Sequence, residues 1–158
     1  MDSDSNYLDG IRSAWLGEKF GETFFCAMAS SSNDDLMRES WRTLAQLEVV
    51  TGNRMASVLE AHGESASTDE IIEISDELLH QYTDAPLQSS MLQMKETIEK
   101  AVVRFDQLLA TTPDEDVTAV QFLVDHELAL LAFVERKLDG EHEHALDAVN
   151  SLLESKTH

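Results

Sequence analysis

The sequence predicts an all-α protein in which residues 1–158 form one domain, an antiparallel bundle of four long helices. Apolar residues recur at spacings of three and four along four segments of roughly 25–29 residues each, which is the period of an amphipathic helix. No stretch alternates between apolar and polar residues for long, so strands are not expected. The two prolines, Pro86 and Pro113, stand where long segments begin.

Four long helices and two shorter ones are expected. The long helices cover about residues 6–30, 34–62, 86–111 and 114–138. An extra helix over about 68–82 lies between the second and third, and a short C-terminal helix covers about 142–155. Long helices with short joints favour an up-and-down order. The apolar stripes predicted to form the core include Leu8, Ile11, Trp15, Phe25, Ala29, Met37, Trp41, Leu44, Met55, Val58, Met91, Met94, Ile98, Ala101, Phe105, Leu108, Ala119, Phe122, Ala129 and Phe133.

Capping signals mark the ends of these helices. Three helix starts carry a capping side chain together with acidic residues near the positive end of the helix. They are Asn33-Asp34-Asp35, Ser67-Thr68-Asp69-Glu70 and Thr112-Pro113-Asp114-Glu115, and the last two are typical capping boxes. Gly63 and Gly140 follow periodic segments and are predicted to be C-terminal caps.

The charge and the cysteine content narrow the functional classes. The chain has 31 acidic and 11 basic residues, a net charge of −20, and such a surface repels nucleic acid and anionic membranes. The acidic N-terminus lacks the features of a signal peptide, and the apolar runs are too short to cross a bilayer. Cys26 is the only cysteine, which fits a reducing, cytoplasmic compartment, and its neighbours Phe25 and Ala27 predict a core position.

Ionisable residues interrupt three of the four apolar stripes. Glu18, Glu22 and Glu48 each lie seven residues from a stripe residue on both sides, and so does His126. Glu127 follows His126 and falls between two leucines. These five side chains are therefore predicted on buried helix faces, where an unpaired carboxylate costs several kcal/mol or takes a raised pKa.

Something must neutralise such a cluster: a bound cation, a pairing Arg or His, or a wet cavity. The third long helix has only bordering candidates, Glu99 and Glu96, with Arg104 further along. Gly17 and Gly21 each precede a glutamate of the first helix. Since glycine costs a helix about 1 kcal/mol relative to alanine, we expect a neighbouring helix to approach closely there.

With these residues the chain resembles the ferritin-like superfamily, including rubrerythrin-type proteins, over residues 7–138. The family pattern has a glutamate on the first and third helices and Glu-x-x-His on the second and fourth. The resemblance implies Glu22 or Glu18 as the ligand of the first helix and Glu48 as that of the second. It implies Glu99, with Glu96 as the alternative, on the third helix.

The second and fourth long helices each lack one residue of the family pattern. Thr51 stands where the histidine of the second helix belongs. On the fourth helix His126 has Leu123 in place of its glutamate, and Glu127, if it is the carboxylate, has Leu130 in place of its histidine. The spacing does recur as Glu77 with His80 and as Glu141 with His144, but in flanking segments, where chance is the better explanation.

The sequence therefore predicts a ferritin-like bundle without a complete di-iron site, which needs roughly six protein ligands. One alternative is an oxidoreductase with a single iron, zinc or manganese ion held by Glu22, Glu48 and His126, supported by Glu127 or Glu99. The other is a non-catalytic module that forms a homodimer or binds a protein, with its acidic residues paired to His126 or Arg104. The absence of Glu-x-x-His from the second and fourth helices favours the non-catalytic module.

Overall fold

The computed structural model describes residues 3–66 and 72–155, and every regular element within these ranges is helical. The all-α prediction is therefore confirmed for these residues. The α-helices are α1 (Ser3–Ser31), α2 (Asp35–Ala61), α3 (Asp76–Thr83), α4 (Leu87–Ala110), α5 (Val117–Leu138) and α6 (Asp147–Ser155). Short 3₁₀ turns, η1 (Asp114–Asp116) and η2 (His142–His144), precede α5 and α6.

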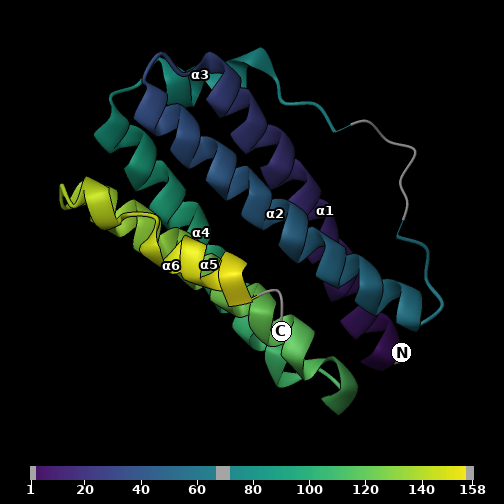
Figure 1. Cartoon of the computed structure of the whole chain (residues 1–158). Helices are drawn as coiled ribbons and strands as arrows, with labels where there is room; N and C mark the ends of the chain where they lie inside the picture. The colour runs from purple at the N-terminus through teal and green to yellow at the C-terminus, as the bar shows by residue number, and fades with distance from the viewer. Residues whose placement is uncertain (1–2, 67–71, 156–158) are drawn as a thin grey trace.

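The long helices form two antiparallel pairs, α1 with α2 and α4 with α5, and α5 also packs on α2 and α6 (Figure 1). α4 begins beside the start of α2, since Leu87 and Met37 line one pocket there. α5 begins beside the end of α2, where His62 Nε2 lies 2.7 Å from Asp116 Oδ2. Consequently α2 and α4 run in the same direction, and the chain between them crosses from one end of the molecule to the other. This differs from the up-and-down order expected from short joints.

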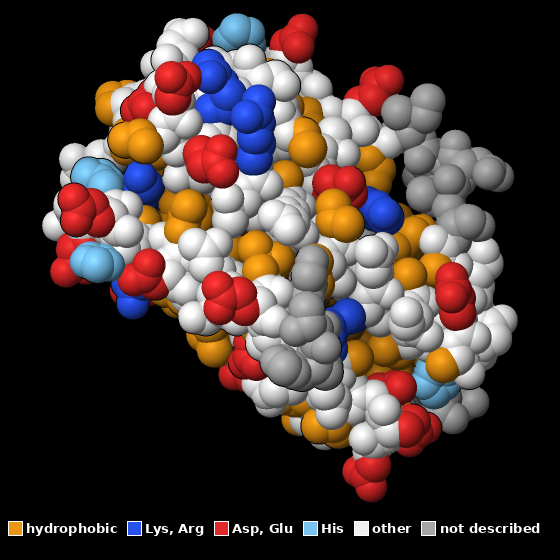
Figure 2. Space-filling model, viewed as in Figure 1, with side chains coloured by type: hydrophobic (Ala, Val, Ile, Leu, Met, Phe, Trp, Pro, Cys, Tyr) orange, Lys and Arg blue, Asp and Glu red, His pale blue; other side chains and the backbone are white. Residues whose placement is uncertain are grey.

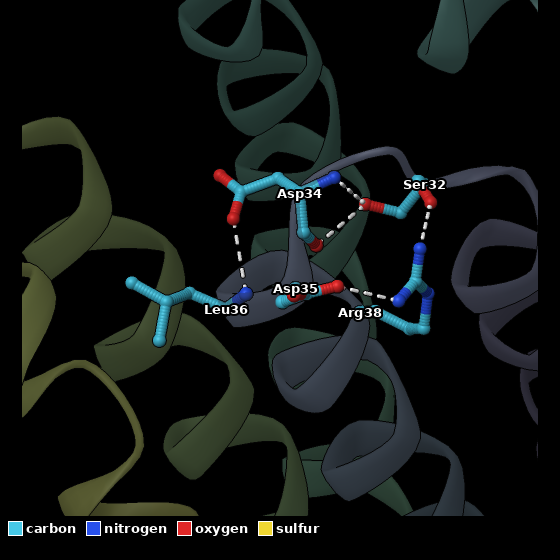
Figure 3. Close-up of polar contacts among 5 residues, drawn as sticks. All are labelled: Ser32, Asp34, Asp35, Leu36 and Arg38. Carbon is cyan, nitrogen blue, oxygen red and sulfur yellow. Dashed lines mark hydrogen bonds and ion pairs between the residues drawn. The ribbon is translucent and has the colours of Figure 1, made fainter.

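The tight turn between α1 and α2 shows how local side chains set the first pair (Figure 3). The Leu36 amide donates to Asp34 Oδ1 at 3.0 Å, so Asp34 is the predicted N-cap of α2. The Arg38 guanidinium donates to Asp35 Oδ1 and to the Ser32 carbonyl, each at 2.7 Å. These contacts satisfy the exposed ends of both helices and turn the chain back along α1.

Other helix ends agree in part with the predicted signals. Gly63 and Gly140 have φ of +78° and +80°, the left-handed conformation of a C-terminal cap. The helix expected over 68–82 begins only at Asp76, because Ser75 is its N-cap and accepts from the Leu78 amide; the capping box at 67–70 lies outside the described residues. Thr112 does not cap, because its hydroxyl donates back to the Leu108 carbonyl at 2.8 Å.

The core consists of two apolar clusters that follow one another along the helices. One surrounds Phe25, Trp41 and Phe133, with the rings of Phe25 and Trp41 stacked 5.9 Å apart. The other contains Trp15 and Met55. Most residues of the predicted stripes are buried in these clusters. Cys26 is not, and this prediction was wrong: adjacency to Phe25 in sequence turns a helical side chain to another face.

The helix α5 is the most apolar part of the chain. The segment Asp114–Leu138, 25 residues long, is long and apolar enough to cross a membrane. This differs from the expectation based on the length of the apolar runs. However, 56% of its apolar window is buried inside the protein, as in the core helix of a soluble protein. Figure 2 shows acidic side chains spread over the visible face rather than gathered in one patch.

Candidate metal centre

A layer of ionisable side chains separates the two apolar clusters. Glu18 of α1, Glu48 of α2 and His126 of α5 each contribute one potential ligand atom, and these atoms all lie within 4.8 Å of one another. The three residues are only 3%, 5% and 0% exposed. The gaps in the three apolar stripes therefore meet at one level of the fold.

His126 lies at the centre of this layer. Its Nε2 is 3.4 Å from Glu18 Oε2 and 3.4 Å from Glu48 Oε2. Its Nδ1 lies 2.6 Å from the hydroxyl of Thr51, a short hydrogen bond that fixes the plane of the ring. Among the described residues neither Nε2 nor Glu18 Oε2 has a hydrogen-bond partner. Two buried polar atoms thus face each other without any donor and acceptor geometry to satisfy them.

Two glycines make room for the carboxylates in a reciprocal way. A Cβ at Gly21 of α1 would stand 2.7 Å from Glu48 Cδ, and a Cβ at Gly52 of α2 would stand 3.3 Å from Glu18 Cβ. Each helix therefore leaves a notch for the glutamate of the other. The close approach predicted at Gly21 is found, whereas a Cβ at Gly17 would meet nothing within 4 Å, so that prediction was wrong.

Burial controls the protonation of this layer. Loss of hydration raises the pKa of Glu48 from 4.5 to about 8, against a hydrogen bond with Glu18 that lowers it. Loss of hydration, followed by the charge of Glu48, raises the pKa of Glu18 well above its usual value. Both carboxyl groups therefore stay protonated to a higher pH than an exposed glutamate does, and the pKa of each depends on the other.

Glu127 lies on the cavity side of the same layer. Its Oε1 is 3.8 Å from His126 Nε2, and burial raises its pKa from 4.5 to about 7, while His126 and Arg104 lower it. Glu127 is therefore the least perturbed of the three buried glutamates, and the charge of Arg104 contributes to this.

A cavity of about 430 Å³ opens onto these carboxylates. It lies between α1 and α4, which do not pack closely against each other, and Leu78 and Tyr82 of α3 close one end. Its floor carries Glu18, Glu48 and Glu127, and its walls are mostly aromatic and aliphatic. The centre is thus buried in the bundle yet reachable from solvent.

The structure keeps several predicted ligands away from this centre. Glu99 is exposed, because it stands one residue beyond the buried Ile98. Glu96 is exposed and pairs with Lys100 at 3.4 Å. Glu22 is partly exposed and lies 4.0 Å from Lys19, so Glu18 is the carboxylate of α1 that points inward.

The isolated Glu-x-x-His pairs do not form sites either. His80 bonds Asp84 Oδ2 at 2.9 Å and is exposed. His144 bonds Asp147 Oδ2 at 3.1 Å and is also exposed. Among the described residues each of these histidines pairs with an aspartate rather than with the glutamate three residues before it, which agrees with chance spacing.

Sequence reasoning missed three functional features. Thr51 stands where the family pattern has a histidine, and its hydroxyl instead binds a ring nitrogen of His126 on another helix, which spacing along α2 does not reveal. Gly52 carries the same sequence signal as Gly21, because both are glycines inside a long helix. Asp116 accepts from the Tyr7 hydroxyl at 2.9 Å and contacts His62, which ties α1, α2 and α5 together at the far end.

Comparison of the chain with protein-family models, with curated proteins and with solved structures gives no match.

Proposed function

We propose that this protein is a ferritin-like four-helix bundle that binds one divalent iron, zinc or manganese ion through Glu18, Glu48 and His126. The observation that carries the proposal is the fully buried Nε2 of His126, which has no hydrogen-bond partner and faces a carboxylate oxygen on each of two other helices. The parallel course of α2 and α4, joined by a long crossover, supports the ferritin-like assignment.

The spacing of the ligand atoms suits a first-row metal. Nitrogen and oxygen ligands lie about 2.0–2.2 Å from such an ion, and a tetrahedral arrangement then separates the ligand atoms by about 3.4 Å. The Nε2 of His126 is 3.4 Å from both carboxylate oxygens. A cation would also offset the cost of burying these two carboxylates, whose pKa values burial raises.

The ligand set supports one ion rather than two. Glu18, Glu48, His126 and Glu127 are the inward-facing candidates among the described residues, fewer than the roughly six that a di-iron site uses. On α5, leucines (Leu123 and Leu130) occupy the positions where the family pattern would place the missing partners of His126 and Glu127. Thr51 takes a supporting role instead, because Nδ1–H of His126 donating to its hydroxyl leaves Nε2 free to bind a metal.

The cavity determines what the ion could do. Glu18, Glu48 and Glu127 line its floor, so an open coordination position would face it. Iron or manganese would supply redox chemistry with oxygen or peroxide there, and zinc would supply Lewis-acid chemistry. In either case Glu127 lines the floor beside His126 and would be the side chain placed to accept a proton.

Metal analysis of protein prepared without a histidine tag tests the proposal. Metal-depleted protein is dialysed against Zn²⁺, Mn²⁺ or anaerobic Fe²⁺, and bound metal is measured by elemental analysis. We expect about one ion per chain, lost in Glu18→Gln and in His126→Asn, because each removes one of three ligands.

Two glutamates outside the proposed ligand set provide matched controls. Glu22→Gln alters the same helix as Glu18, and Glu99→Gln alters α4; both should keep the metal. Circular dichroism checks that every variant stays helical. A folded wild-type protein that takes up none of the three metals would refute the proposal, and so would equal binding by Glu18→Gln and Glu22→Gln.

A further inference from the structure

The cavity between α1 and α4 has the composition of a ligand pocket. Its volume of about 430 Å³ falls within the range of pockets for small organic molecules. Phe24, Phe25 and Phe105 are buried in its wall, and Met94 and Ile98 complete an apolar surface around the acidic floor. An apolar body therefore fits the walls, and a single polar atom fits the floor.

Gly17 indicates that the mouth of this cavity is kept open. Glycine inside a helix costs about 1 kcal/mol relative to alanine, and this cost usually reflects close packing. Here no atom lies within 4 Å of a Cβ built at Gly17, so packing does not explain it. Gly17 is exposed and lines the cavity next to Phe20, which is 42% exposed. A side chain at Gly17 would occupy the entrance.

The charges of the occupied centre select an uncharged ligand. A divalent ion would offset the two carboxylates of Glu18 and Glu48, and the charge of Arg104, which lines the same cavity, would offset that of Glu127. The charges of the ion, the three carboxylates and Arg104 then add up to zero. A charged group brought from water into this apolar cavity would lack a counter-charge, at a cost of several kcal/mol.

We propose that the cavity binds an uncharged apolar molecule, such as a small aromatic alcohol, with its one oxygen directed at the metal between Glu18, Glu48 and His126. This inference rests on the proposed metal site. The aromatic walls hold the apolar body, Gly17 leaves the entrance free, and the open coordination position receives the oxygen. The substrate class of the centre is accordingly neutral and apolar.

Three probes of one shape and different charge test the inference: benzyl alcohol, benzylammonium and benzoate. Binding to zinc-loaded protein is measured by calorimetry and by ligand-observed NMR, after elemental analysis of each sample. Benzyl alcohol should bind at least about tenfold more tightly than either ion, a difference of roughly 1.4 kcal/mol. In zinc-free protein benzyl alcohol should bind at least about tenfold more weakly, because its oxygen then has no metal ion to bind.

A pair of substitutions on α1 locates the binding site. Gly17→Leu should keep stoichiometric zinc but weaken benzyl alcohol at least about tenfold, since leucine fills the entrance. Ser13→Leu, one turn earlier, exposed and outside the cavity lining, should change neither. Leucine favours a helix over glycine or serine, so both variants should fold.

The outcomes separate the two proposals. Absence of zinc from folded wild-type protein refutes the metal site, and the ligand inference falls with it. Stoichiometric zinc with benzoate or benzylammonium bound as tightly as benzyl alcohol overturns the ligand inference alone. Equal affinity of benzyl alcohol for Gly17→Leu and wild type also overturns it, because the ligand would then lie elsewhere.

Discussion

Glu48→Gln tests whether burial of the acidic layer governs stability in the metal-free protein. The Glu48 carboxyl has a pKa of about 8 in the folded protein, raised by loss of hydration from 4.5. Between these values the folded protein keeps a proton that the unfolded chain has released. Stability should therefore fall as the pH rises from about 4.5 to 8, the opposite of the usual behaviour of a salt-bridged carboxylate.

The size of the effect follows from linkage. When the folded state binds one proton that the unfolded state has released, the free energy of unfolding changes by about 1.4 kcal/mol per pH unit. Over the window set by Glu48 this amounts to at most about 5 kcal/mol, against a total stability of about 5–15 kcal/mol for a typical domain. Glutamine keeps the shape of Glu48 but cannot ionise, so Glu48→Gln should remove most of this loss.

Urea unfolding at pH 5 and pH 8, after treatment with a chelator, measures the difference. Wild type should lose at least about 2 kcal/mol more than Glu48→Gln between the two pH values. Titrating groups far from Glu48 are common to both proteins and largely cancel. Glu18 does not, because the charge of Glu48 raises its pKa in wild type only. Adding Zn²⁺ at pH 8, at a hundredfold excess over Kd, should raise the free energy of unfolding of wild type by about 2.7 kcal/mol. Parallel pH profiles for the two metal-free proteins would show that the reasoning about Glu48 is wrong.

Four further substitutions probe the packing and hydrogen bonds of the described helices. Gly17→Ala should stabilise the protein by about 1 kcal/mol, while Gly21→Ala should gain nothing or lose stability, because its Cβ would meet a buried carboxylate at 2.7 Å; equal urea midpoints for the two variants would contradict this. Thr51→Val should keep the fold but weaken metal binding about 10–100-fold by removing the bond to His126, and unchanged affinity would argue against a supporting role. Tyr7→Phe should cost about 1–3 kcal/mol of unfolding free energy, since a buried hydrogen bond to a carboxylate is lost; a cost below about 0.5 kcal/mol would show that water replaces the hydroxyl.

The helices and the buried polar layer could be predicted from sequence because both leave a local periodic signal. Glu48 and His126 interrupt regular apolar stripes, and the only way to continue those stripes is to bury them. Glu18 and Glu22 satisfied the same spacing, so periodicity alone could not choose between them. The choice depends on where α2 presents Gly52, which is a tertiary property.

The cavity and the course of the chain could not be predicted in this way. Spacing along one helix does not report how far α1 stands from α4, and the direction of α4 depends on where the crossover from α2 ends. Glu99 illustrates the same limit, because a border position becomes exposed or buried according to the neighbour that packs beside it. The predicted homodimer and the cytoplasmic location stay predictions.

The notch at Gly21 makes two positions on different helices share one volume. Any side chain at residue 21 occupies space that the carboxylate of Glu48 now fills. Shortening that acid to aspartate would withdraw the carboxylate by about one carbon–carbon bond, roughly 1.5 Å, so Gly21→Ala should be tolerated better beside Glu48→Asp than alone. A double-mutant cycle should then give non-additive stabilities, and natural variation at either position would be expected to occur in step with the other.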